Sequence, residues 1–267
     1  MYPVLFSIGD FDVHTFGVLL ALGFIAGVYT ATIQAERAGL DLDQVTNVLL
    51  LILACSIIGA RAAFVAVSWQ HFVANPMEVI RLHKGGLVYY GGLIGGLLAG
   101  LVGTRMAHLP LGRFADIIPA GLCIGQILGR LGCFANGCCY GAVCSVPWAV
   151  RLHSGPGAMV PRHPTQLYEA LFLSAILAVC LWLFRRPHRP GMVMVLYLYL
   201  YGVGRYAVEL FRGDDRGASP IPGLSVSQSI SLGVLVLASI VHLLAARQPL
   251  AAAEPPPEKP DLAPDPL

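Results

Sequence analysis

Charged side chains are scarce in this chain of 267 residues. Asp, Glu, Lys and Arg together make up 12% of it and hydrophobic residues 56%, whereas about a quarter of the residues in a soluble domain are charged. The chain therefore has too little polar surface to cover a water-exposed sphere. Its seven cysteines are too few for a disulfide-stapled miniprotein, and its apolar content excludes a disordered chain. No basic stripe accompanies the net charge of +2, so no nucleic-acid partner is expected. What remains is a polytopic membrane protein.

Seven apolar stretches approach the length that crosses a bilayer. A spanning helix needs about 20 mostly apolar residues. The fourth stretch is the weakest, because it is rich in glycine and carries Arg130 near its end. The sequence therefore predicts an all-α integral membrane protein with about seven transmembrane helices, at residues 13–33, 46–68, 87–105, 117–134, 167–184, 192–210 and 226–246.

The distribution of Lys and Arg predicts the orientation, since cytoplasmic loops carry an excess of both. With the N-terminus outside, eight of these residues lie on the cytoplasmic side, six outside and three within the apolar stretches. The margin is small, and the compact cluster at 185–189 decides it. We expect a periplasmic N-terminus and a cytoplasmic C-terminus. Residues 1–247 form the membrane domain, and residues 248–267, with seven prolines, are expected to be a disordered cytoplasmic tail.

Three arginines fall within the apolar stretches: Arg61, Arg130 and Arg205. An arginine at the middle of a spanning helix costs about 2.5–3.5 kcal/mol on insertion scales, so each needs a reason. An interhelical ion pair or snorkelling would be a structural reason, and for Arg61 it is as good as a functional one. Arg130 lies between Gly129 and Gly132, which would let a lipid headgroup or another helix approach.

A stripe of polar residues runs along one face of the helix expected at 192–210. Tyr201, Arg205, Glu209 and Arg212 are spaced at i, i+4, i+8 and i+11, which places them on a single helical face. A glutamate between two arginines can orient a guanidinium group and leave donors for a phosphate. Together with Arg130, this stripe indicates an anion site at the outer membrane face, where a phospholipid is the commonest anion.

Small residues recur at every fourth position in the stretch 87–105. One ridge is Gly92, Gly96 and Gly100, and a second is Gly91, Gly95, Ala99 and Gly103. Such ridges are typical of closely packed membrane helices. Tyr89 and Tyr90 precede them at the expected outer interface.

Several segments together resemble one family, the bacterial prolipoprotein diacylglyceryl transferases. The most specific is the run Arg-His-Pro-Thr-Gln-Leu-Tyr-Glu at 162–169. The others, in family order, are His-Thr-Phe-Gly at 14–17, Gly-Ala-Arg at 59–61, Tyr-Gly-Gly-Leu-Ile-Gly at 90–95, Gly-Arg-Leu-Gly-Cys-Phe-Ala-Asn-Gly at 129–137 and Tyr-Gly-Val-Gly-Arg at 201–205.

The resemblance implies a bacterial inner-membrane enzyme that moves the diacylglyceryl group of phosphatidylglycerol onto the lipobox cysteine of a prolipoprotein signal peptide. The products are a thioether and glycerol 1-phosphate, and no cofactor or metal is implied. Its partners would be that lipid, the signal peptide and the surrounding membrane lipids. The residues that match phosphatidylglycerol-binding and catalytic positions are Arg130, Arg205, Tyr201, Glu209 and Arg212. We assign Arg130 to the lipid phosphate and Arg205 to the leaving group, and the two could exchange roles.

One departure from the family pattern concerns the general base. The family usually has a histidine, proposed as the base, where this chain has Tyr90. A phenol with a pKa of about 10 is a poor base at neutral pH, although it can donate a hydrogen bond. The base is then His163 or His83, or none is required. The candidate catalytic residues are Arg205, Tyr90 and His163.

A second departure brings in cysteines. Cys133 stands where the family usually has Asn, and Cys138 where it has Glu; with Cys139 and Cys144 they form the pattern C-x4-C-C-x4-C. In an oxidising compartment a disulfide is the favoured interpretation. A metal site is disfavoured, because no histidine lies at ligand spacing and the pattern is not that of a zinc motif.

Three other functions remain open. The chain could be a divergent phosphatidylglycerol-dependent transferase with another acceptor. It could also be a membrane thiol-redox protein that uses the cysteines, although that would leave the intramembrane arginines unexplained. A transporter is disfavoured, since no inverted repeat is evident.

Overall fold

The computed structural model describes residues 2–9, 11–81, 85–153, 159–213, 219 and 221–247. The expected tail at 248–267 and the candidate base His83 lie outside the described residues.

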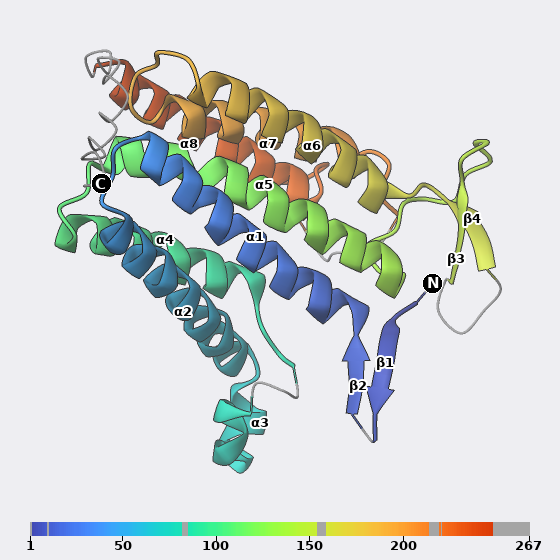
Figure 1. Cartoon of the computed structure of the whole chain (residues 1–267). Coiled ribbons are helices and arrows are strands. Elements are labelled where there is room, and N and C mark those ends of the chain that lie inside the picture. Colours follow the sequence, from blue (N-terminus) through green and yellow to red (C-terminus); the bar gives the residue numbers. More distant parts are fainter. Residues whose placement is uncertain are drawn as a thin grey trace, which may run out of the picture.

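Long helices dominate the described chain (Figure 1), and one lies in each of the seven expected stretches. Five of them are long and apolar enough to cross a membrane, and the two 18-residue helices, α4 and α7, are not among these five. The chain is therefore a mainly helical membrane protein. The seven are α1 (Thr15–Arg37), α2 (Leu42–Val67), α4 (Tyr89–Met106), α5 (Leu111–Asn136), α6 (Thr165–Phe184), α7 (Met192–Glu209) and α8 (Val226–Ala246).

Two short β-hairpins correct the expectation of a purely α-helical chain. Antiparallel strands β1 (Val4–Ile8) and β2 (Phe11–His14) precede α1, and β3 (Val150–His153) pairs with β4 (Met159–Arg162) between α5 and α6. Strands of four or five residues are too short for their alternation to stand out from the apolar background. Both hairpins lie at the same end of the helical bundle, away from the C-terminal end of α8 (Figure 1).

Glycines allow close contact between pairs of helices. A Cβ atom at Gly59 of α2 would lie 2.4 Å from the carbonyl oxygen of Gly91 in α4, and one at Gly95 would lie 2.4 Å from that of Cys55. The packing role expected for Gly91 and Gly95 is therefore confirmed. A similar contact joins α1 and α5, where a Cβ at Gly27 would lie 3.0 Å from the oxygen of Gly121. Only small residues permit such approaches between backbones.

Arg61 has the structural role that the sequence left open. Its guanidinium group donates to the carbonyl oxygens of Val79 at 2.8 Å, Gly85 at 2.7 Å and Glu78 at 2.5 Å. Glu78 and Val79 belong to the 3-10 helix η1 (Pro76–Ile80), which follows α3 (Trp69–Ala74), and Gly85 comes later in the same connection to α4. We call α3 and η1 together the arm. Arg61 thus fastens the arm to α2, and it does not join the other arginines.

A buried carboxylate caps α7 at the opposite end of the bundle. Asp116 of α5 accepts hydrogen bonds from the backbone N–H groups of Gly191 at 2.6 Å and Val193 at 2.8 Å. A negative charge at the N-terminus of α7 accepts hydrogen bonds from backbone N–H groups that have no partner within the helix, and it complements the helix dipole. Its hydrogen bond also raises the pKa of His188, in the loop before α7. This contact sets the position of α7, whose other end carries the polar stripe.

Candidate functional site

A buried ion-pair network lies where α5, α6 and α7 meet near the hairpins. Its centre is Glu169 of α6, whose side chain is 2% exposed. Glu169 pairs with Nε of Arg130. Its Oε1 lies 3.3 Å from Nη1 of Arg205 and 3.7 Å from Nη1 of Arg212. One carboxylate therefore draws together arginines that lie far apart in the sequence.

A second carboxylate, Glu209, completes the network from the helical stripe. Its Oε2 lies 2.8 Å from Nη2 of Arg205 and 3.9 Å from Nε of Arg212. The start of α8 supports both partners. Ser225 donates a 2.9 Å hydrogen bond to Glu209, and Ser227 accepts one of 2.8 Å from Arg205. The guanidinium group of Arg205 is thereby held by both carboxylates and by Ser227.

The charges of this network do not balance. Among the side chains of the described residues in these ion pairs, three arginines face two glutamates, so these five carry a formal charge of +1 when all are ionised. The side chain of Arg130 is 23% exposed, whereas those of Arg205 and Arg212 are 8% and 3% exposed. A monoanion such as a phosphodiester would neutralise the group, and Arg130 is the arginine that it could reach most easily.

Four of the five residues expected to bind lipid are thus brought together: Arg130, Arg205, Glu209 and Arg212. The fifth, Tyr201, borders the network within electrostatic range of Arg130 and Glu169, and its ring stacks on Tyr197 at 5.6 Å.

The two other candidate catalytic residues lie apart from the ion pairs. Tyr90 is 47% exposed, and its ring contacts that of Tyr89 edge to face. Tyr89 is the neighbour that lies within electrostatic range of Arg130 and Arg205. The Nδ1 atom of His163 lies 3.1 Å from the hydroxyl of Tyr168. Both roles remain predictions.

His163 lies on the wall of an adjoining apolar cavity of about 580 Å³. Trp148, Tyr168, Phe172 and Phe211 also line it. The indole of Trp148 donates a 2.7 Å hydrogen bond to the hydroxyl of Tyr168. The wall also includes Gly204, the residue before Arg205 on α7, and Tyr168, the residue before Glu169 on α6, so the same two helices carry the cavity wall and the ion pairs.

Glu169, the centre of the ion-pair network, is not among the site residues expected from the sequence. It ends the run at 162–169 and lies within the apolar stretch 167–184. The insertion cost that singled out the arginines applies equally to a buried acid. The insertion cost of Glu169 could therefore have identified it, although the sequence analysis names it only as the end of the motif at 162–169.

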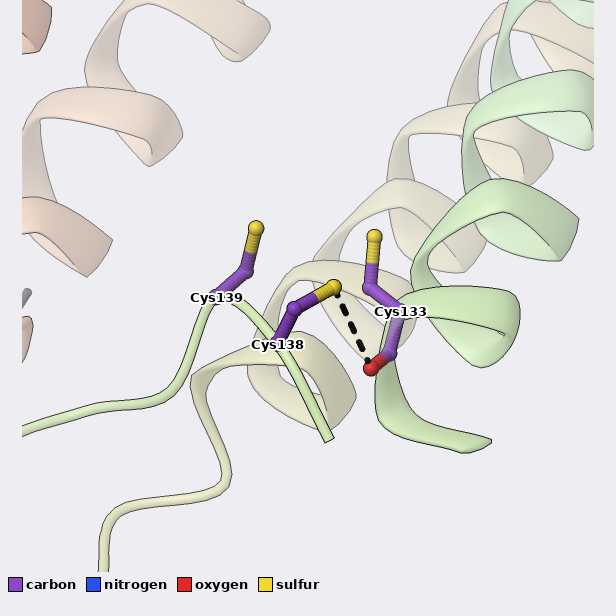
Figure 2. A group of neighbouring side chains, drawn as sticks. All are labelled: Cys133, Cys138 and Cys139. Atoms are coloured by element: carbon purple, nitrogen blue, oxygen red, sulfur yellow. Dashed lines mark hydrogen bonds between the residues drawn. The ribbon is translucent and has the colours of Figure 1, made fainter. Parts of the chain in front are cut away.

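The loop after α5 gathers three of the four clustered cysteines (Figure 2). Gly137 and Cys139 both have left-handed backbones, with φ of 74° and 61°. These turns fold the loop back on the helix, so that the Sγ atoms of Cys133, Cys138 and Cys139 all lie within 4.8 Å of one another. The thiols are free, and Cys144 lies outside the group. The disulfide remains a prediction.

The start of α6 holds this loop in place. Gln166 donates a 2.6 Å hydrogen bond to the carbonyl oxygen of Cys138, and Thr165 donates one of 2.9 Å to that of Cys139. Since Glu169 follows one turn later, the same helix positions the cysteine loop and the arginines.

The thiols adjoin the arginine network. Hydrogen bonds from Cys133 and Cys138 lower the pKa of the Cys139 thiol, and the charge of Arg212 and its hydrogen bond to Cys139 lower it further. Arg130 lies within electrostatic range of Cys133 and Cys139. The site therefore combines arginine cations with sulfur atoms beside them.

Fold and site together define a helical membrane protein with a buried cluster of ion-paired arginines at one end. Residues 3–244 match the family model of prolipoprotein diacylglyceryl transferase. The chain belongs to this family.

Curated relatives match over nearly the whole chain. The phosphatidylglycerol–prolipoprotein diacylglyceryl transferase of Geobacter sulfurreducens is 34% identical over 251 residues, covering 92% of this chain and 96% of the relative. That of Clostridioides difficile is 32% identical over 243 residues, or 91% and 95% of the two chains. That of Mannheimia succiniciproducens is 35% identical over 246 residues, or 90% and 89%.

Proposed function

We propose that this protein transfers the diacylglyceryl group of phosphatidylglycerol to the lipobox cysteine of prolipoproteins. The reaction forms a thioether and releases glycerol 1-phosphate. The observation that carries the proposal is the ion-pair network of three arginines and two glutamates. Its guanidinium groups offer N–H donors to a phosphodiester headgroup, and Arg130 is the most exposed of the three.

The chemistry explains why arginines are needed. A thiolate attacks a saturated carbon of the lipid glycerol while the bond from that carbon to the phosphate oxygen breaks. The departing phosphate gains negative charge, and guanidinium groups that are already oriented stabilise it in a site shielded from water. Arg130 binds the lipid phosphate. Arg205, fixed by Glu169 and Glu209, faces the leaving group.

The apolar cavity beside α7 offers a place for an acyl chain of the lipid substrate. An acyl chain loses little by leaving the bilayer for a wall of aromatic and aliphatic side chains. Phe172 and Phe211 line this wall. The headgroup would then lie at the arginines while an acyl chain extends along α7.

In the membrane, we infer that α4 and α7 cross with the five longer helices. The N-terminus and the arginine network then lie at the periplasmic face of the inner membrane, and the C-terminus lies in the cytoplasm. The support is the bias of Lys and Arg. Arg37, Arg105, Arg185 and Arg247 lie at or just beyond the C-terminal ends of α1, α4, α6 and α8.

The test is incubation of the purified protein with phosphatidylglycerol and a lipobox peptide. We expect a peptide whose mass increases by one diacylglyceryl group, and none with Arg130→Ala. Absence of the product under conditions in which a related transferase works would refute the proposal. Complementation of a strain depleted of its own transferase, with the same variant as negative control, tests it in the cell.

A second candidate keeps the lipid and changes the acceptor. It is favoured by the replacement of three residues of the usual pattern, at Tyr90, Cys133 and Cys138. Release of glycerol 1-phosphate without a lipobox peptide would support it.

A further inference from the structure

The reaction needs a thiolate, and the network has no evident base to make one. A free thiol has a pKa of about 8.5, so about 3% of it is ionised at pH 7. Within the described residues, the side chains that form the ion pairs are arginines and glutamates that already bind one another. Tyr90 is a phenol, and His163 lies on the wall of the neighbouring cavity. The source of the thiolate has to be sought elsewhere in the site.

We propose that Cys133, Cys138 and Cys139 bind a zinc ion whose fourth coordination position takes the acceptor thiolate. The inference rests on the proposed function, and it assigns the step that activates the acceptor. Zinc sites that act in catalysis have three protein ligands and one open position, unlike closed structural sites with four.

The positions of the sulfur atoms fit this coordination. Zinc–sulfur bonds of about 2.3 Å at tetrahedral angles place thiolates about 3.8 Å apart. The three Sγ atoms all lie within 4.8 Å of one another without an ion. Each pair of sulfur atoms would therefore have to approach by at most about 1 Å to reach the distance expected around zinc. The linear spacing that disfavoured a metal is overcome by the left-handed turns at Gly137 and Cys139, which fold the loop so that Cys138 and Cys139 lie beside Cys133 (Figure 2).

The exposure of the cysteines and the charges around them are also compatible with a zinc site that binds a substrate thiolate. Cys138 and Cys139 are half-buried, so a substrate group could reach an ion bound to them. Zinc with three thiolates carries a charge of −1, and Arg130 and Arg212 lie beside the sulfur atoms. In the described part of the chain, no fourth Cys, His, Asp or Glu belongs to the group. The open position therefore points to an external ligand, and soft thiolates are preferred partners of zinc.

The proposed step balances in atoms and charge. The acceptor thiol displaces water from zinc and releases its proton to solvent, since a coordinated thiol is deprotonated. Its sulfur then bonds to the glycerol carbon. The bond from that carbon to the phosphate oxygen breaks, and its electron pair leaves with glycerol 1-phosphate. The neutral thioether is a poor ligand and departs, and water returns to the zinc.

The first experiment measures the metal in the full-length protein, purified in detergent without a metal-affinity step and supplied with zinc. We expect one zinc per chain. X-ray absorption at the zinc edge should change from three sulfurs and one light atom to four sulfurs when lipobox peptide is added without lipid. Loss of zinc on gel filtration, a disulfide among the three cysteines, or coordination that peptide leaves unchanged would each overturn the proposal.

Variants locate the site. Cys138→Ser and Cys139→Ser should lose the bound zinc, whereas Cys55→Ser, which removes a half-buried thiol of α2, should retain it. Circular dichroism establishes that each variant folds. If a serine variant does not fold, the absorption spectrum of the unchanged protein still decides the question.

The pH dependence of transfer separates thiol activation from a purely structural metal. Removing zinc should slow transfer about 30-fold at pH 7, because about 3% of a free thiol is ionised there, and the loss should shrink toward pH 9. The charged groups beside the sulfurs are Arg130 of α5 and Arg212 beyond α7, and these arginines in turn contact Glu169 of α6.

The two proposals fail in different ways. Transfer that proceeds equally fast without zinc would overturn the zinc proposal and leave the proposed function intact. A four-sulfur zinc site that forms with peptide, but yields no thioether when lipid is present, would support the metal site and overturn the transfer reaction.

Discussion

Neutralising Glu169 should expose how much the arginines depend on it. The variant Glu169→Gln retains the size of the side chain and one acceptor oxygen, but it raises the formal charge of the network from +1 to +2. Removing one partner of a buried ion pair typically costs 3–5 kcal/mol. Because Arg130 is partly exposed and Glu209 still pairs with Arg205, we expect the lower end, about 3 kcal/mol of unfolding free energy.

Equilibrium unfolding in mixed micelles measures this loss. Glu36→Gln is the matched control, since Glu36 is exposed at the end of α1 and its change should stay within about 0.5 kcal/mol. Phosphatidylglycerol should restore part of the stability of Glu169→Gln, because its phosphate supplies the missing negative charge, and phosphatidylcholine should restore less. If Glu169→Gln unfolds like the control in all these micelles, Glu169 does not hold the arginines together and the reasoning is refuted.

Three further results are expected. Arg130→Ala should lower the rate of thioether formation by at least about 100-fold while far-ultraviolet circular dichroism stays unchanged, because it removes the exposed cation of the anion site; activity within tenfold of the unchanged protein would refute this. Arg61→Ala should leave several carbonyl oxygens of the arm without their donor and speed limited proteolysis between Trp69 and Gly86; an unchanged cleavage rate would show that Arg61 does not fasten the arm. Hydrogen bonding to Asp116 raises the pKa of His188 in the folded protein. The stability that His188 contributes is therefore complete below its unfolded pKa of about 6.5 and is lost as pH rises through the folded pKa. The difference in unfolding free energy between the unchanged protein and His188→Ala should shrink between pH 6 and pH 9.

Hydropathy predicted the seven long helices, and insertion cost predicted two arginines of the ion-pair network. Each expected apolar stretch contains a helix, because a continuous apolar run of this length leaves few other structures in a membrane. The same cost argument selected Arg130 and Arg205, which meet at one carboxylate. It left Arg61 undecided, because a carbonyl acceptor 24 residues away, at Gly85, leaves no periodic trace in the sequence.

The parts that escaped prediction depend on contacts between distant segments. Nothing in the order of residues places α6 against both α5 and α7, so Glu169 could be recognised as costly but not as the centre of the network. The cysteines show the same limit. Their linear spacing resembles no metal motif, yet two residues with positive φ bring three sulfur atoms together. Spacing along the chain is a poor guide where the backbone turns sharply between ligands.

The scarcity of charge in this chain explains the composition of its site. Three arginines alone, largely buried near a membrane, would repel one another and lack partners whenever no lipid is bound. Two carboxylates make the empty site stable and hold Arg205 and Arg212 in place. A third carboxylate would compete with the phosphate for the same donors. The two carboxylates therefore keep the site stable without substrate, while Arg130, the most exposed arginine, can still offer its donors to a phosphate headgroup.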